Sequence, residues 1–188
     1  GLGDVYKRQE KGCAKINLAL HVTGIQADGY HSLDSIVVFT DVFDRLFFKR
    51  SLKNVVTLTG EFSGSINVQE NSILQALKLF GNGLTDRFSI NLEKNLPIGA
   101  GLGGGSADAA AVIRFITNNS KHLMPSYEVL SKIGADIPAC VLSVASRVGG
   151  IGEIVRPLDI SEINLWVVLV NPDIFVSVSY THLRAHET

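Results

Sequence analysis

The sequence predicts an α+β fold, on three observations. The first sixty residues contain several short segments with the apolar patterning of strands. Two later segments repeat their apolar residues at helical spacing instead, and strands and helices follow one another without a regular βαβ rhythm. The 188 residues, with 46% hydrophobic and 19% charged side chains, are enough for one such domain with a sizeable core.

The amino-terminal part of the chain is expected to form strands. Residues 14–22 alternate, with Ala14, Ile16, Leu18, Leu20 and Val22 on one face and polar residues on the other, so the strand should be half-buried. Asp28-Gly29 signals a turn after it. Further apolar runs lie at 36–39 and 45–48, and a β-branched strand is expected at 55–59.

Helices and strands mix after residue 70. Asn71 is a good amino-terminal cap for a helix, and residues 88–92 alternate as a strand. A second helix is expected from Ala107, and two short ones at 127–133 and directly after Asp136. Strands are expected at 153–158 and 165–170. The buried positions of the first two helices are Ile73, Leu74, Leu77 and Phe80, then Ala109, Val112, Ile113 and Ile116.

A glycine-rich loop separates the strand at 88–92 from the second helix. Between residues 99 and 105 it places five glycines in seven positions. Glycine accepts positive φ and lets backbone amides approach a ligand. Ser106 is expected to cap the helix, whose free N–H groups and positive dipole end then face the loop. This arrangement predicts a phosphate site, most naturally for a nucleoside triphosphate.

Other glycine loops fit less well. A Walker A loop needs a lysine before the serine, and here Gly105 stands in its place. The dinucleotide fingerprint matches, but no acidic residue ends a second strand about 20 residues on. The protein-kinase motifs are absent. A purely structural glycine turn stays open as an alternative, although so many glycines are entropically costly for that purpose.

Composition excludes several partners and sites. A net charge of −1 argues against nucleic acid and anionic lipid, and no apolar run has the length of a membrane span. Cys13 and Cys140 are isolated and lack metal-ligand spacing, so we predict a reducing, cytoplasmic location and no protein metal site. Residues 1–9 and 179–188 resemble translated sequencing adapters and are expected to be non-native ends outside the fold.

Three separated motifs resemble those of the GHMP small-molecule kinases. Residues 97–108 resemble their phosphate loop. Residues 14–18 with 28–31, and residues 134–138, resemble the amino-terminal signature and the catalytic aspartate motif of one branch. That branch phosphorylates the 2-hydroxyl of a cytidine diphosphate-linked methylerythritol in non-mevalonate isoprenoid synthesis. The resemblance implies a ribosomal S5 domain 2-like ATP- and substrate-binding domain over 10–160. A ferredoxin-like second domain would begin at 161–178 and be largely missing, so the chain would be a fragment that can lack activity.

The resemblance also implies roles for individual residues. Lys15 and Asp136 would be catalytic, the lysine stabilising developing charge and the aspartate taking the hydroxyl proton. ATP, with Mg²⁺, would be held by Asn71, Pro97, Gly99, Gly101, Leu102, Gly103, Gly104, Gly105 and Ser106. The cytidine diphosphate substrate would contact Asn17, Tyr30 and His31.

Structural alternatives stand beside these roles. Asp136 and Asn71 are both good helix caps, and a Lys-x-Asn pair suits a solvated strand face. Asp108 is expected to be a first-turn acid favoured by the helix dipole. For the whole chain, the alternatives are another GHMP kinase, of homoserine or mevalonate type, and a non-catalytic nucleotide-binding fragment.

Overall fold

The computed structural model describes residues 8–27, 29–65, 72–81, 86–163 and 166–170. Its strands are β1 (Arg8–Ile25), β2 (His31–Ser51), β3 (Val55–Thr59), β4 (Arg87–Glu93), β5 (Ser146–Gly150) and β6 (Ile154–Pro157). Its α-helices are α1 (Ser72–Leu79), α2 (Gly104–Asn119), α3 (Tyr127–Ser131) and α4 (Ile137–Leu142), and a 3₁₀ turn lies at Ser63–Ser65. The α+β class is confirmed.

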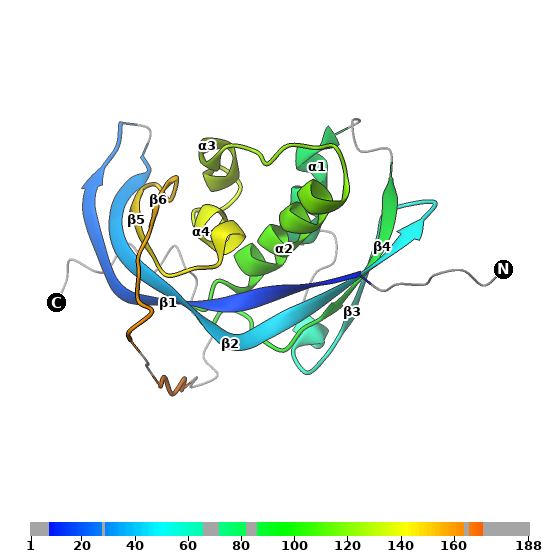
Figure 1. Ribbon diagram of the computed structural model, residues 1–188, viewed down its shortest axis with the longest axis horizontal. Helices are drawn as coiled ribbons and strands as arrows, with labels where there is room; N and C mark the ends of the chain where they lie inside the picture. The colour runs from blue at the N-terminus through cyan, green and yellow to red at the C-terminus, as the bar shows by residue number, and fades with distance from the viewer. Residues whose placement is uncertain (1–7, 28, 66–71, 82–85, 164–165, 171–188) are drawn as a thin grey trace.

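The described strands form a six-stranded sheet in the order β3-β4-β2-β5-β6, with β1 paired to β2. Only β3 and β4 run parallel, joined through α1, and the other pairs are antiparallel. The sheet is built on the long β1–β2 hairpin, whose turn includes Gly29 at φ 86°. Figure 1 shows the hairpin bending around the helices, which lie together on one side of the sheet.

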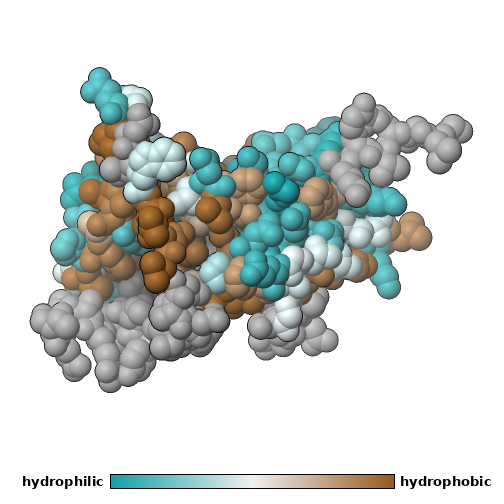
Figure 2. All heavy atoms as spheres, turned by 90° about the horizontal axis from the view of Figure 1, so that it is seen from below, coloured by the Kyte–Doolittle hydropathy of each residue, from teal (hydrophilic) through white to brown (hydrophobic). Residues whose placement is uncertain are grey.

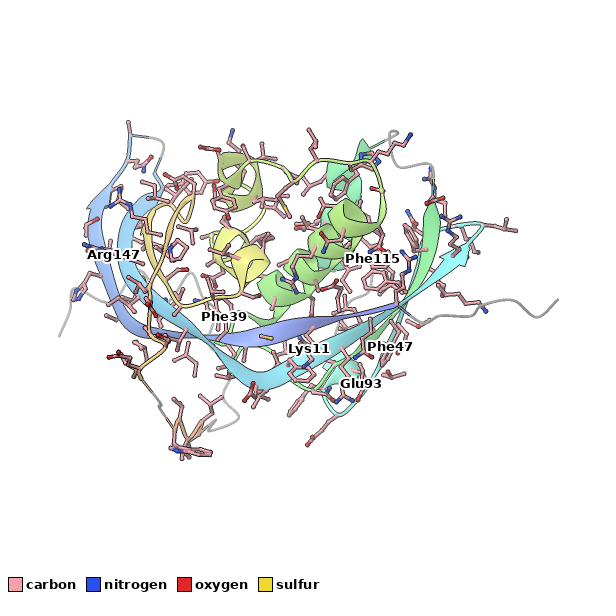
Figure 3. All side chains as sticks on the ribbon, viewed as in Figure 1. Lys11, Phe39, Phe47, Glu93, Phe115 and Arg147 are labelled. Atoms are coloured by element: carbon pink, nitrogen blue, oxygen red, sulfur yellow. The ribbon has the colours of Figure 1, made fainter. Side chains whose placement is uncertain are left out.

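The core lies between the sheet and helix α2. This helix is buried from Ala107 to Ile113 without interruption, because its alanines let the backbone approach the sheet closely. Phe115, labelled in Figure 3, stacks on Phe48 of β2 with ring centroids 3.8 Å apart and meets Phe88 of β4 edge-on. The predicted buried positions of both helices that the structure describes lie in or against this core.

The strand prediction for 14–22 is confirmed in position and in the burial of Ala14, but the predicted buried face is wrong at Leu18 and Leu20. Leu18 and Leu20 are 50% and 39% exposed, whereas Lys15 is 4% exposed. The pairing register shifts between Cys13 and Lys15, and again between Asn17 and Ala19, so strict alternation does not hold along the strand. Figure 2 shows hydrophobic side chains gathered over part of the surface seen from below.

Three further expectations need correction. Helix α2 begins at Gly104 rather than Ala107, because Gly103, with φ 65°, takes the N-cap position. Arg8 and Gln9, expected outside the fold, extend β1 by pairing with Phe48 and Phe47. Residues 166–170 form no strand and pair with none of the described strands; Trp166, at 99%, is fully exposed.

Some features were not anticipated or lie outside the described residues. Strand β5 was missed because its sequence, Ser-Arg-Val-Gly-Gly, has little strand patterning. Residues 1–7 and 171–188 are not described, which leaves the predictions for the ends and for a second domain as predictions. Within the described chain, no helix combines the length and apolarity needed to cross a membrane.

Candidate active site

The glycine loop adopts the backbone that its composition predicts. Gly99, Gly101 and Gly103 have φ values of 71°, 74° and 65°, in the left-handed region that favours glycine. The loop ends at the amino terminus of α2, whose first N–H groups have no partner within the helix. Gly101 and Gly105 are exposed, so the helix terminus is accessible to an anion.

Strand β1 is tied directly to this loop. The backbone N–H of Lys15 donates to the carbonyl of Leu102 over 2.9 Å. The strand therefore places the Lys15 side chain beside the last loop residues. Pro97, which opens the loop, is half-buried.

Lys15 and Asp136 meet at the end of the loop. Lys15 Nζ lies 3.0 Å from Asp136 Oδ1, with side-chain exposures of 4% for the lysine and 37% for the aspartate. Gly103 packs against both: a Cβ there would lie 3.2 Å from Lys15 Cε and 3.4 Å from Asp136 Oδ2. Three motifs far apart in the sequence thus converge at the start of α2, with the carboxylate open to solvent.

Asn17 completes the immediate surroundings of the lysine. Lys15 Nζ donates to Asn17 Oδ1 over 2.5 Å, and Asn17 Nδ2 donates to Ser35 Oγ over 2.7 Å. Ser35 in turn donates to the carbonyl of Ala19 over 2.7 Å. This chain of hydrogen bonds links the ammonium group to β2 and restricts its position. Lys15 and Asn17 lie on one face of β1, as predicted, but that face is not solvated at Lys15.

Asp136 occupies the N-cap position of α4, yet its side chain makes no capping hydrogen bond. The capping alternative therefore does not account for the carboxylate, which faces Lys15 instead. Ala135, the residue before Asp136, packs against the turn between β5 and β6. Gly152, with φ 115°, lies so close that a Cβ would overlap the Ala135 carbonyl oxygen. Only glycine fits at this contact.

Ser106 lies within the first turn of α2 and is not its cap, since no side chain caps that helix. Its hydroxyl lies near Gly134, where a Cβ would be 3.4 Å away. The start of α1 also borders the loop, because a Cβ at Gly105 would lie 3.6 Å from Ser72 Oγ. Asn71 itself is outside the described residues.

Tyr30 and His31 lie at the other end of the β1–β2 hairpin. His31 pairs with Ile25, whereas Lys15 pairs with Phe39. At about 3.3 Å per residue, these two points are on the order of 25 Å apart along the strand. Tyr30 is 52% exposed. Along the hairpin, Tyr30 and His31 are therefore remote from the Lys15–Asp136 pair.

Sequence reasoning missed a buried charge cluster beneath the loop. Lys94 Nζ donates to Asp44 Oδ2 and, over 3.0 Å, to Asp108 Oδ2. Burial raises the pKa of Asp108 to about 8, against the opposing effect of the Lys94 charge. Burial lowers the pKa of Lys94, but Asp108 and Asp44 outweigh it, and the net shift is upward. Asp108 is therefore a buried hydrogen-bond partner of Lys94 rather than a first-turn surface acid. No spacing pattern in the sequence connects these three residues.

The residues that the structure describes contain no group of three or more His, Cys, Asp or Glu side chains placed to hold a metal ion. Asp108, the acid nearest the loop in sequence, is already paired with Lys94. Among the carboxylates that the structure describes at the start of α2, Asp136 is the one that is partly exposed to solvent.

Known proteins match most of this chain. Residues 71–151 match the GHMP kinases N terminal domain. A curated 4-diphosphocytidyl-2-C-methyl-D-erythritol kinase of Cereibacter sphaeroides (strain ATCC 17025 / ATH 2.4.3) is 41% identical over 164 residues, 87% of this chain and 58% of the relative. A relative of the same name from Paracoccus denitrificans (strain Pd 1222) is 42% identical over 167 residues, 88% of this chain and 56% of the relative.

A solved structure agrees with these relatives. The crystal structure of a 4-(cytidine 5'-diphospho)-2C-methyl-D-erythritol kinase superposes with a TM-score of 0.64 at 31% identity, over 80% of this chain and 55% of that one. The chain thus spans a little over half the length of the relatives that it matches. The segment 71–151, which matches the GHMP kinases N terminal domain, contains the glycine loop, α2 and Asp136, so this part of the chain is similar to that domain.

Proposed function

We propose that this domain serves an ATP-dependent kinase whose acceptor is the 2-hydroxyl of 4-diphosphocytidyl-2-C-methyl-D-erythritol, a step in isoprenoid precursor synthesis. One observation carries the proposal: the Lys15–Asp136 pair lies against Gly103, where the glycine loop enters α2. The acceptor is taken from the name of the curated relatives. A phosphate site with an ammonium and an accessible carboxylate beside it has the parts that phosphoryl transfer to an alcohol needs.

The loop amides and the start of α2 would hold the triphosphate. Gly99, Gly101 and Gly103 turn the backbone so that it can lie close to phosphate oxygens, and the free N–H groups of the helix supply donors. Ser106, in the first turn, adds a hydroxyl donor. Asn71 would contact the adenine side, and it directly precedes Ser72, which borders the loop.

The acceptor hydroxyl would lie between Lys15 and Asp136. As its oxygen bonds to the γ-phosphorus and the bond to ADP breaks, the Asp136 carboxylate takes the hydroxyl proton. Lys15 Nζ stabilises the charge on the transferred group, and Asn17 holds the ammonium in place. Tyr30 and His31, at the far end of the hairpin, would contact the cytosine of an extended substrate.

The donor set at this site fits Mg²⁺ only as an ion carried mainly by the nucleotide. Mg²⁺ commonly keeps several waters and binds through substrate phosphates with one or two carboxylates. Asp136 is the described carboxylate available for that purpose. When bound, the ion would neutralise charge on the phosphate oxygens. Both cysteines are free thiols, which fits a cytoplasmic location.

The test uses the 188-residue chain in excess over [γ-³²P]ATP, with the cytidine substrate, homoserine or mevalonate as acceptor. We expect label on the cytidine substrate and about 10²- to 10⁴-fold slower transfer by Asp136→Asn. Binding of a fluorescent ATP analogue should be retained in this variant, because the loop amides and the start of α2 hold the nucleotide and the fold does not depend on a capping bond from Asp136. Asp34→Asn, which removes an exposed carboxylate on β2, is the matched control.

Several results would contradict the proposal. Unchanged transfer by Asp136→Asn would remove the proton-accepting role. Preferential labelling of homoserine or mevalonate would favour another GHMP kinase. ATP binding without transfer to any acceptor would favour a nucleotide-binding fragment.

A further inference from the structure

The buried charge cluster of Lys94, Asp44 and Asp108 has no part in the proposed chemistry. Its members are 4%, 0% and 2% exposed. Lys94 directly follows β4, Asp44 belongs to β2 and Asp108 to α2. Burying three ionisable groups is expensive, and apolar side chains of similar volume often give equal or greater stability. The position of the cluster suggests why the charges are present.

The cluster binds the chain where it enters the glycine loop. Asp44 Oδ1 accepts hydrogen bonds from the backbone N–H groups of Asn95, over 2.6 Å, and Leu96, over 2.8 Å. These are the two residues before Pro97. The backbone of Lys94 also pairs on both sides, donating to the Thr59 carbonyl over 2.7 Å and accepting from the Phe62 N–H over 3.1 Å.

The same cluster contacts the chain where it leaves the loop. Lys94 Nζ would lie 3.0 Å from a Cβ at Gly104, the first residue of α2. One turn further on, Asp108 Oδ2 accepts from the same ammonium group. The other oxygen, Asp108 Oδ1, is buried without a hydrogen-bond partner and lies where a Cβ at Gly12 of β1 would come within 2.8 Å.

We propose that Lys94, Asp44 and Asp108 are positioning residues that fix the two ends of the glycine loop relative to each other and to β1. One buried polar cluster then sets the positions of the loop amides and of the Gly103 contact with Lys15. This inference rests on the proposed function, because it assumes that the loop binds ATP. A cluster that merely stabilises the fold would make the same contacts, so the test must separate affinity from stability.

The decisive variant removes all three ionisable groups together, as Asp44→Asn, Lys94→Met and Asp108→Asn in one chain. This change avoids leaving a lone buried charge, which would threaten folding. The single variant Asp108→Asn is the conservative comparison, since the amide oxygen can still accept from Lys94. Arg114→Met is the matched control. It removes a different cation, the largely buried Arg114 of α2. Arg114 binds the Glu10 carboxylate and the backbone carbonyls of Lys11 and Cys140, and not the loop.

Each protein is examined for thermal unfolding and for the dissociation constant of a fluorescent ATP analogue, below its unfolding temperature. We expect the triple variant to bind about tenfold or more weakly than the wild type, since small displacements of positioned groups are costly. Asp108→Asn and Arg114→Met should remain within about threefold of the wild type, whatever their unfolding temperatures. Faster amide exchange at residues 98–105 in the triple variant should accompany the loss of affinity.

The outcomes are distinguishable. If the wild type binds no ATP analogue, the proposed function and this inference both fail. If the wild type binds and the folded triple variant binds equally well, the positioning role is wrong and the function stands. If the triple variant does not fold, amide exchange in the double variant Asp44→Asn/Lys94→Met decides, because that change removes the pair that ties the loop entry to the start of α2. Unchanged exchange at 98–105, together with faster global exchange, overturns the proposal.

Discussion

Replacing Gly103 by alanine should damage transfer far more than stability. Gly103 has φ 65°, and a left-handed backbone costs a side chain about 1–2 kcal/mol. Alanine regains roughly 0.4–1 kcal/mol by restricting the unfolded chain. The net backbone loss is therefore about 1 kcal/mol, or roughly 2–4 °C in the unfolding temperature of a chain of this size.

The larger effect comes from what the new methyl group would touch. It would lie 3.2 Å from Lys15 Cε, which is closer than an ordinary van der Waals contact, and 3.4 Å from Asp136 Oδ2. A shift of the Lys15 side chain by a few tenths of an ångström relieves the contact, so the clash itself costs little stability. The displaced ammonium and carboxylate are the proposed reacting groups, however, and misplacement of this kind costs up to about 10²-fold in rate.

Gly81→Ala provides the matched control. Gly81 also has positive φ, at 51°, and a Cβ there would meet nothing within 4 Å. Both variants should unfold within a few degrees of each other, while single-turnover transfer falls only in Gly103→Ala. Equal transfer rates in the two variants would show that the contact of Gly103 with Lys15 and Asp136 places no constraint on the chemistry.

Three further predictions follow from particular contacts. Gly152→Ala should lower the unfolding temperature and slow transfer while sparing ATP binding, because its Cβ would displace Ala135 and with it Asp136; normal transfer would refute this link. Stability should fall as pH rises from about 4 to about 8, because folded Asp108 keeps a proton that the unfolded chain loses above its ordinary pKa of 3.8. The urea concentration at half-unfolding, measured at several pH values, should fall less with rising pH in Asp108→Asn than in the wild type. An identical fall would contradict the raised pKa of Asp108. Asp34→Asn should change stability by less than about 1 kcal/mol, because its bond to Arg147 is exposed, and a larger loss in urea unfolding would be unexpected.

The sequence predicted the local features that depend on nearby residues. The turn at Gly29, the strand at 55–59 and the glycine loop all follow from backbone preferences and short-range patterning, and the structure contains each of them. The predicted start of the second helix, at Ala107, was three residues too late. Gly103 adopts the left-handed N-cap conformation, and a propensity argument based on Ser106 does not capture this. The convergence of Lys15, Asp136 and the loop was expected only from the family resemblance.

Features set by long-range contacts could not be read from the sequence. The buried face of β1 depends on register shifts against β2, so Lys15 is buried and Leu18 is exposed, contrary to the alternation. Strand β5 exists because β2 offers a pairing edge to a segment with weak strand preference. The Lys94 cluster joins residues from three elements, and each of them taken alone resembles an ordinary surface charge.

The central claim is that the amides at the mouth of α2 bind the nucleotide next to Lys15 and Asp136. Amide NMR of the ¹⁵N-labelled chain, titrated with ATP and magnesium, tests it directly. The account predicts shifts concentrated at residues 99–106, with further shifts at Lys15 and Asp136. Shifts confined to other surfaces, or none at saturating nucleotide, would contradict it.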